Sequence, residues 1–110
     1  MTDGTDLMQA LMDTLGDHDA AIGQMRVDGR AYAERERDYR IALASKIAAL
    51  REEGMPATIT PDLARGDTHV AALRFERDLA RVEWEADRSN CERLKNQAWI
   101  VERQIDRELR

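Results

Sequence analysis

The chain has 110 residues and a formal net charge of −5, which argues against the strongly basic face that phosphate binding on DNA requires. Its length is that of one domain, so we expect a single helical domain over residues 1–110. Ala, Glu, Lys, Leu and Arg make up 53 of the residues, close to the half that is typical of long helices and coiled coils.

Cysteine usage and hydropathy limit the compartment. The single cysteine, Cys91, excludes an internal disulfide and suits a reducing compartment. The chain does not open on a basic segment followed by an apolar run, and no stretch approaches the roughly 18 apolar residues of a membrane span. We therefore expect an intracellular protein that has no contact with a membrane.

The first thirty residues predict a helical arm. Thr5 is a suitable N-cap, and apolar residues follow it at helical spacing: Leu7, Met8, Leu11, Met12 and Leu15. Glycines at positions 16, 23 and 29 each cost about 1 kcal/mol relative to alanine inside a helix. We therefore expect a short N-terminal arm over residues 5–29 that is kinked, broken or frayed, before a helix that runs to residue 53.

A heptad pattern runs through this part of the chain. One seam is Met8, Leu15, Ile22, Gly29, Glu36, Leu43 and Leu50, and its companion is Leu11, His18, Met25, Tyr32, Tyr39 and Lys46. Glu36 and Lys46 interrupt the seam, which indicates an ordinary apolar helix face more than a strict zipper.

Residues 54–67 predict a compact corner. Gly54 stands where a left-handed C-cap residue belongs, and Pro56 prevents the helix from resuming. Thr60 is the expected N-cap of a single helical turn that starts with Pro61. Gly66 is expected to end that turn, and Asp67 or Thr68 to cap the next helix.

A long helix is expected over residues 68–109, because neither proline nor glycine occurs there. Its seam toward the first helix is Val70, Leu73, Arg77, Ala80, Trp84, Asp87, Cys91, Leu94, Ala98, Val101 and Ile105. A second stripe, turned about 200° from the seam, is Ala72, Phe75, Leu79, Val82 and Ala86. Trp99 and Ile100 also lie off the seam. Two helices cannot cover all these faces, so we expect self-association or a surface that is open to another protein.

The residues that often carry chemistry are sparse and separated. His18 and His69 are the only histidines and lie in different predicted elements, so no metal site is expected. Cys91 lies on an apolar seam without a suitable base beside it. We therefore expect no catalytic residues, no cofactor and no enzymatic activity. Residues 88–110 hold six basic and four acidic side chains around Trp99, which leaves nucleic-acid binding as an alternative.

Four stretches carry a family resemblance: "DYRIAL", "LREEGMPATITPDLARGD", "VAALRFERDLA" and "NQAWIVERQIDREL". Together, over about Asp38 to Leu109, they resemble small uncharacterised helical proteins that phages and prophages of Gram-positive bacteria encode, often near recombination and single-strand-binding genes. The resemblance implies a phage genome and the cytoplasm of a bacterial host cell as the setting. It implies no particular activity.

The pattern as a whole predicts an all-α fold, a long antiparallel helical hairpin resembling a coiled coil that forms a homo-oligomer. We expect a non-enzymatic protein that binds a host or phage protein, as an accessory of phage DNA metabolism or as an inhibitor of a host or defence protein such as a CRISPR component. A direct nucleic-acid-binding protein is the alternative. A secreted helical hairpin of about 100 residues ranks third, because the Trp-x-Gly turn of such proteins is replaced by Glu53-Gly54-Met55-Pro56. The candidate interaction surface is Phe75, Leu79, Val82, Trp99, Ile100, Arg65 and Asp67.

Overall fold

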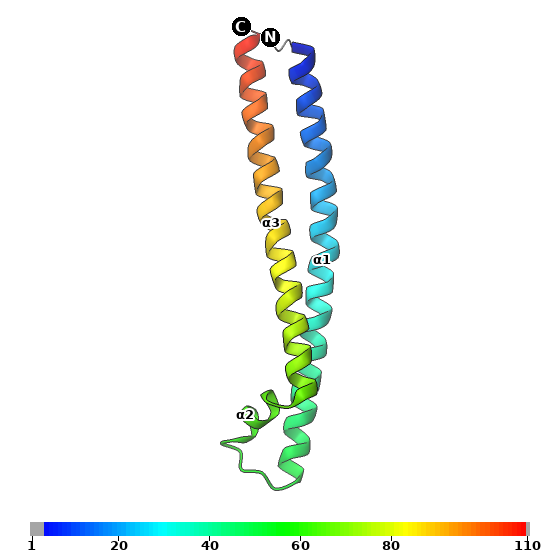
Figure 1. Ribbon diagram of the computed structural model, residues 1–110, viewed down its shortest axis with the longest axis vertical. Helices are drawn as coiled ribbons and strands as arrows, with labels where there is room; N and C mark the ends of the chain where they lie inside the picture. The colour runs from blue at the N-terminus through cyan, green and yellow to red at the C-terminus, as the bar shows by residue number, and fades with distance from the viewer. Residues whose placement is uncertain (1–3, 110) are drawn as a thin grey trace. The chain divides into compact units, whose positions relative to one another are not determined.

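The computed structural model describes residues 4–109 and contains three helices and, within that range, no strand (Figure 1). Helix α1 spans Gly4–Glu52, the short helix α2 spans Thr60–Arg65, and α3 spans Thr68–Glu108. The predicted all-α helical hairpin is confirmed. The chain forms two compact units, and each is described by itself. Of the described residues, the terminal unit comprises 4–27 and 85–109, and the hairpin unit comprises 28–84.

Helix α1 is continuous, which corrects the expectation of a separate arm over residues 5–29. Thr5 lies inside the helix, one residue after its start, and is therefore not its N-cap. Gly16 and Gly23 lie in helical backbone with no other part of the molecule within 4 Å of an added Cβ atom. Intrinsic propensity is a weak guide here, because most helical stability in proteins comes from packing of one face.

Gly29 has a packing role in the hairpin unit. A Cβ atom at this position would lie 3.0 Å from Nε1 and 3.1 Å from Cδ1 of Trp84. The Trp84 ring stacks on Tyr32, with ring centroids 5.8 Å apart. The glycine therefore provides the space in which the indole ring approaches the backbone of α1.

The predicted heptad seam of α1 agrees with the burial pattern in the hairpin unit, and in the terminal unit it fails at two positions. Its other residues there are half-buried, namely Leu11, His18, Ile22 and Met25. In the hairpin unit Tyr39 and Leu50 are buried, as expected. In the terminal unit Met8 and Leu15 are exposed, and the buried residues are Leu7, Thr14 and Ala21. The inner face of α1 contains two successive spacings of four residues, Ala21 to Met25 to Gly29. A seam that repeats strictly every seven residues shifts gradually around a helix of 3.6 residues per turn. An extra spacing of four residues, called a stutter, corrects this shift.

The predicted inner seam of α3 agrees with its burial pattern. Val70, Leu94, Ala98 and Ile105 are buried, and the other seven seam residues are half-buried. In the terminal unit the seam also accommodates Thr14, whose hydroxyl donates to the Ala10 carbonyl at 2.9 Å and lies 3.5 Å from Nε2 of Gln97. The buried hydroxyl is therefore hydrogen-bonded, as buried polar groups require.

The C-terminus of α1 has the geometry that its sequence predicts. Gly54 has a φ of 90°, the only positive φ among the described residues. Its N–H donates to the Arg51 carbonyl at 3.0 Å, and the Met55 N–H donates to the Leu50 carbonyl at 3.1 Å. These two bonds form a Schellman motif, which satisfies carbonyls that the end of a helix otherwise leaves without donors.

Two glycine substitutions test this reading by urea unfolding. Gly54→Ala is expected to lower the free energy of unfolding by about 1–2 kcal/mol, because a side chain disfavours positive φ. Gly23→Ala is the matched control and is expected to raise it by about 0.5–1 kcal/mol, because Gly23 is helical and has open space around it. Equal effects of the two substitutions would contradict the assigned capping role of Gly54.

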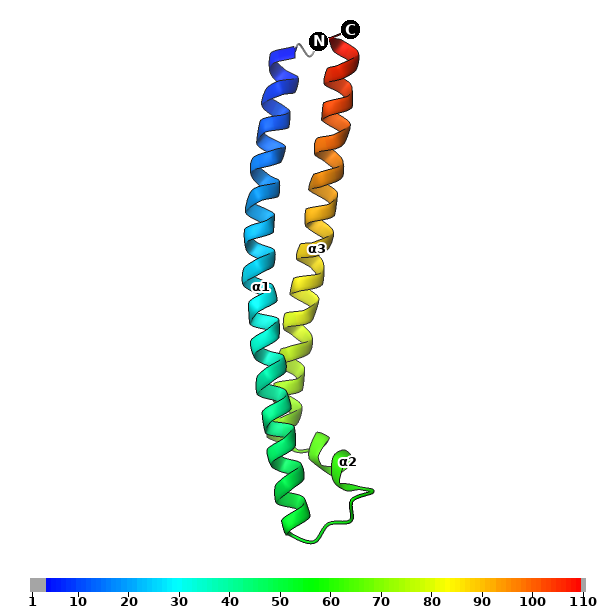
Figure 2. The same ribbon diagram turned by 180° about the vertical axis from the view of Figure 1, so that it is seen from behind.

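The corner between α1 and α3 differs from the prediction in one detail. Thr60 is not the N-cap of α2; that position is Ile59, without a side-chain cap bond. The Thr60 hydroxyl instead donates to the Pro56 carbonyl at 2.7 Å and is buried together with Ala64. This hydrogen bond joins the first residue of α2 to the segment before it, so Thr60 stabilises the corner. Figures 1 and 2 show α2 on one side of the hairpin unit, between the end of α1 and the start of α3.

Asp67, one of the two caps that the sequence allows, caps α3. Its Oδ2 accepts from the backbone N–H groups of His69 at 3.1 Å and Val70 at 3.2 Å, and its Oδ1 lies 3.5 Å from Nζ of Lys46. The hydrogen bond from Val70, the Lys46 charge and the bond from His69 together lower the pKa of Asp67 below its usual 3.8, against the opposing effect of burial. One carboxylate thus starts α3 and ties it to α1 within the hairpin unit.

The cap predicts a pH dependence of stability. Because the folded pKa of Asp67 is lowered, its contribution is present well above pH 3.8 and is lost as the pH falls through the folded value. Asp67→Asn retains a good capping side chain but does not titrate, so the loss of Tm on acidification should be smaller than in the wild type. Asp67→Ala should lower Tm at neutral pH as well. Parallel Tm profiles for Asp67→Asn and the wild type would contradict this assignment.

Candidate interaction surface

The second predicted stripe of α3 is exposed on the hairpin unit. We call Ala72, Phe75, Leu79 and Val82 the outer stripe. Phe75 is 64% exposed, Leu79 52% and Val82 58%, and Ala72 is exposed as well. Their spacings of three, four and three residues place them on one face over about three turns of helix. Three large apolar side chains therefore stand side by side in solvent.

Arg77 fixes the orientation of this part of α3. Its guanidinium lies 3.2 Å from Oε2 of Glu36 and 4.6 Å from the centre of the Tyr39 ring, both on α1, and its side chain is only 16% exposed. Phe75 and Leu79 lie two residues before and after Arg77, so each is turned about 200° from it. The contacts of Arg77 on the inner face therefore direct the outer stripe away from α1.

Glu36, on the α1 side of this cluster, is held as a carboxylate. The hydrogen bond from Arg40 at 2.6 Å is the main cause that lowers its pKa, and the charge and hydrogen bond of Arg77 add to it. Glu36 and Arg40 thus form an ion pair one turn apart on α1, and Arg77 extends it to α3 within the hairpin unit. Sequence spacing did not predict this second contact, because the two residues are 41 positions apart.

Charged residues line the two sides of the outer stripe unequally. On one side Glu76 and Glu83 are exposed and make no ion pair within residues 4–109. On the other side Asp78 lies 2.8 Å from Nη2 of Arg77 and 3.6 Å from Nη2 of Arg81. The hydrogen bond from Arg77, followed by the charges of Arg77, Arg81 and Arg74, lowers the pKa of Asp78. One side of the stripe is therefore acidic and the other is internally neutralised.

The predicted surface residues of the corner are engaged in local contacts. Arg65 pairs with Asp62 at 3.1 Å, one turn earlier in α2. Asp67 uses its carboxylate for the cap and for Lys46. These two residues thus have structural contacts of their own. Three apolar residues of the corner are exposed, namely Met55, Ile59 and Leu63, so the corner does not remove apolar surface from solvent at these positions.

Trp99 and Ile100 belong to the terminal unit, and both are more than half exposed. The Arg103 guanidinium lies 5.0 Å from the centre of the Trp99 ring, within the range of a cation–π contact. One aromatic ring and one arginine do not make the series of stacking platforms that single-stranded nucleic acid uses. These residues are exposed, as expected.

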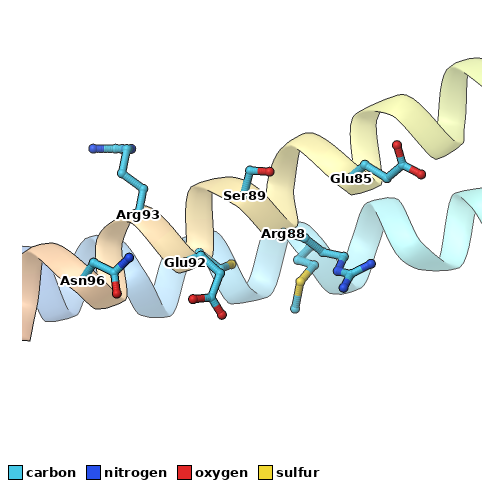
Figure 3. Close-up of a pocket in the computed structure, with 8 residues that line it drawn as sticks. Glu85, Arg88, Ser89, Glu92, Arg93 and Asn96 are labelled. Atoms are coloured by element: carbon cyan, nitrogen blue, oxygen red, sulfur yellow. The ribbon is translucent and has the colours of Figure 1, made fainter.

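The terminal unit also has a shallow groove of about 860 Å³ (Figure 3). Its lining includes Arg88, Glu92 and Arg93 from α3 and Met25 from α1. Figure 3 shows Arg88 and Glu92 extending from one side of the α3 ribbon and Arg93 from the other. Small-molecule sites have polar groups that converge on the ligand, and these charged groups diverge.

A second groove, of about 470 Å³, lies in the hairpin unit between α1 and α3. Ile41, Ala42 and Ala49 of α1 line it together with Val70 and Leu73 of α3. Ile41 is more than half exposed, and the heptad pattern did not single it out, because it lies two residues off the seam. The groove is mainly apolar and open to solvent.

Other candidate chemistry remains dispersed. Among residues 4–109, no three His, Cys, Asp or Glu side chains come together where a metal ion could bind. His18 is half-buried in the terminal unit, His69 is exposed in the hairpin unit, and Cys91 is half-buried on the α3 seam. Within the same range, no helix is both long enough and apolar enough to cross a membrane.

Searches for similar proteins give no further assignment: neither a protein-family model, nor a curated protein, nor a solved structure matches this chain.

Proposed function

We propose that this protein acts without enzymatic chemistry, by binding another protein through the outer stripe of α3. The observation that carries the proposal is the row of three large apolar side chains, Phe75, Leu79 and Val82, each more than half exposed. A contiguous apolar surface of this kind on a soluble protein marks an interaction site more often than a solvent face.

The size of the stripe limits what it contributes. Full burial of one large apolar side chain stabilises by about 1.5–3 kcal/mol, so covering three that are already half-buried contributes about 2–5 kcal/mol. Association itself costs at least that much in lost translational and rotational freedom. The stripe is therefore the anchor of a larger interface, to which neighbouring side chains must also contribute.

The family resemblance supplies the proposed setting, which is a bacterial host cell infected or lysogenised by a phage. There the protein would act as an accessory of phage DNA metabolism or as an inhibitor of a host or defence protein. The acidic balance favours the inhibitor, because a small acidic protein can occupy a nucleic-acid-binding surface on its target. Alternatively, a second copy of the chain would cover the outer stripe by self-association.

Direct nucleic-acid binding is the alternative function. The Trp99–Arg103 contact and the excess of basic over acidic side chains in residues 88–110 favour it. It predicts a mobility shift of single-stranded DNA at low salt that is lost steeply as salt is added. The protein-binding proposal predicts no shift at either salt concentration.

Affinity capture with matched variants tests the proposal. Wild type, Leu79→Lys and Ile41→Lys are each expressed with the same tag in the cells that carry the gene, and captured proteins are quantified by mass spectrometry. Both substitutions place a lysine at an exposed apolar position of the hairpin unit, but only Leu79 lies on the outer stripe. We expect a partner that wild type and Ile41→Lys retain and Leu79→Lys loses. Equal recovery with all three proteins would contradict the proposal.

A further inference from the structure

We propose that the outer stripe receives an amphipathic helix of a partner protein, and that this helix carries basic side chains along the side that lies over Glu76 and Glu83. The inference rests on the proposed function and deepens it, because it names the chemistry of the partner. The inference rests on the arrangement of charges beside the outer stripe. Glu76 and Glu83 lie on one side of it, and the ion-paired Asp78 lies on the other.

Glu76 and Glu83 lie on the same side of the stripe. Glu76 follows Ala72 by four residues, and Glu83 follows Leu79 by four, so each carboxylate lies one turn beyond a stripe residue. Seven residues separate them, or about 10.5 Å along the helix. Neither makes an ion pair within the described residues. A partner helix with cations two turns apart would therefore match both carboxylates.

On the opposite side of the stripe, the carboxylate of Asp78 needs no cation from a partner. Asp78 is already paired with Arg77 and Arg81, and its lowered pKa is consistent with a carboxylate held among cations. A cation of the partner on that side would meet Arg81 as well as Asp78. The surface thus favours a helix with a basic side and specifies which side it is.

A second copy of the chain fits this surface less well. An antiparallel pairing centred on Leu79 sets Glu76 beside Glu83 of the second copy, and a parallel pairing sets Glu83 beside Asp78 of the second copy, by the positions that flank an apolar helix seam. The antiparallel arrangement opposes like charges, which disfavours pairing. In the parallel arrangement Glu83 meets an Asp78 that Arg77 and Arg81 already neutralise, so it gains no cationic partner of its own from Asp78. A basic partner gains from the same glutamates, so charge complementarity selects a different protein.

The occupant is a helix because of the form of the surface. Side chains of α3 at spacings of three and four residues make ridges that another helix matches along its length. Residues 4–109 contain no strand, so this part of the chain offers no sheet edge that an extended peptide could join. Recognition is therefore expected through side chains at i, i+3, i+4 and i+7 of the partner.

Two synthetic helices test the proposal on the full chain. Both are 21-residue peptides with leucine at heptad positions a and d; one has lysine and the other glutamate at e and g. Fluorescence anisotropy is measured at low salt and at 0.5 M salt. We expect the lysine peptide to bind about tenfold tighter than the glutamate peptide at low salt, because its lysines can pair with Glu76 and Glu83 while the glutamates of the other peptide oppose them.

A charge-reversed variant locates the effect. Glu76→Lys with Glu83→Lys should reverse the preference between the peptides. Glu52→Lys with Glu53→Lys changes the net charge equally at an exposed site away from the stripe, and should leave the preference in place. Equal binding of both peptides, or equal effects of the two double variants, would overturn the inference.

Failure of this inference differs from failure of the proposed function. If both peptides bind equally and Leu79→Lys abolishes both, the stripe is a binding surface but the glutamates do not select the partner. A mass of twice 12.6 kDa by light scattering, restored to 12.6 kDa by Leu79→Lys, would show that a second copy occupies the stripe and would also overturn the inference. A constant mass of 12.6 kDa supports it.

Discussion

Replacing Leu94 by alanine is expected to lower the free energy of unfolding by about 2–3 kcal/mol, whereas Leu79→Ala should change it by no more than about 0.5 kcal/mol. Both leucines are in α3, but Leu94 is 5% exposed on the inner seam of the terminal unit and Leu79 is 52% exposed on the outer stripe. Removing buried methyl groups loses transfer free energy and leaves a cavity, and neither cost applies at an exposed site. Urea unfolding followed by circular dichroism measures both values.

The difference between the two variants separates the two faces of α3. Leu79→Ala serves as the control for any change in helix propensity, because the substitution and the type of element are the same. A cost at Leu79 as large as that at Leu94 would mean that the outer stripe is buried in the free protein. The stripe would then contribute to the fold or to a stable oligomer, and it would not be open to a different partner.

Arg77→Ala has the second-largest expected effect, a loss of about 2 kcal/mol in the free energy of unfolding. The substitution removes the ion pair with Glu36 at 3.2 Å and the contact with the Tyr39 ring at 4.6 Å. It leaves Glu36 with Arg40 as its remaining ionic partner. Because Arg77 is little exposed, water does not readily replace these contacts.

Arg74→Ala is the matched control for Arg77→Ala, because Arg74 is an exposed arginine of the same helix; its effect should stay within about 0.5 kcal/mol. A double-mutant cycle of Arg77→Ala with Glu36→Gln should give a coupling energy of at least about 0.5 kcal/mol. Additive effects would mean that Arg77 stabilises the hairpin unit through its contacts with Tyr39 and Asp78 rather than through Glu36.

Much of α3 was predictable because its inner seam follows one regular alternation of three- and four-residue spacings. No proline or glycine interrupts residues 68–108, and the regular spacing from Val70 to Ile105 left one choice of inner face. The same regularity made the outer stripe predictable. A helix with apolar residues on two opposite faces can bury only one of them when a single other helix packs against it. The second face of α3 was therefore expected to be exposed.

Helix α1 was less predictable because two weak signals misled in the same region. The glycine penalties suggested a break before residue 30, but packing of the inner face keeps the helix continuous. A strict heptad placed Met8 and Leu15 inside, although Leu7 and Thr14 occupy those positions. A stutter between Ala21 and Gly29 shifts the register, and nothing in the local sequence marks it.

Which charges of the candidate surface are paired could be seen only in the structure. Asp78 and Glu83 look alike in the sequence, yet Asp78 is paired with two arginines and Glu83 makes no ion pair within the described residues. Asp67 was predicted both as a cap and as a surface residue, and its geometry assigns the carboxylate to the cap. Sequence spacing identifies which residues share a face. It does not identify which of their charges remain available.

Photo-crosslinking at Phe75 tests the central claim most directly. Phe75 is replaced by p-benzoylphenylalanine, which keeps an aromatic side chain at a position that is 64% exposed, and the protein is irradiated inside the cells that carry its gene. Ile41, which is also exposed but lies off the outer stripe, receives the same probe as a control. The account predicts a covalent adduct of one different protein at position 75 and none at position 41. The absence of an adduct at position 75, or the same adduct at both positions, would contradict it.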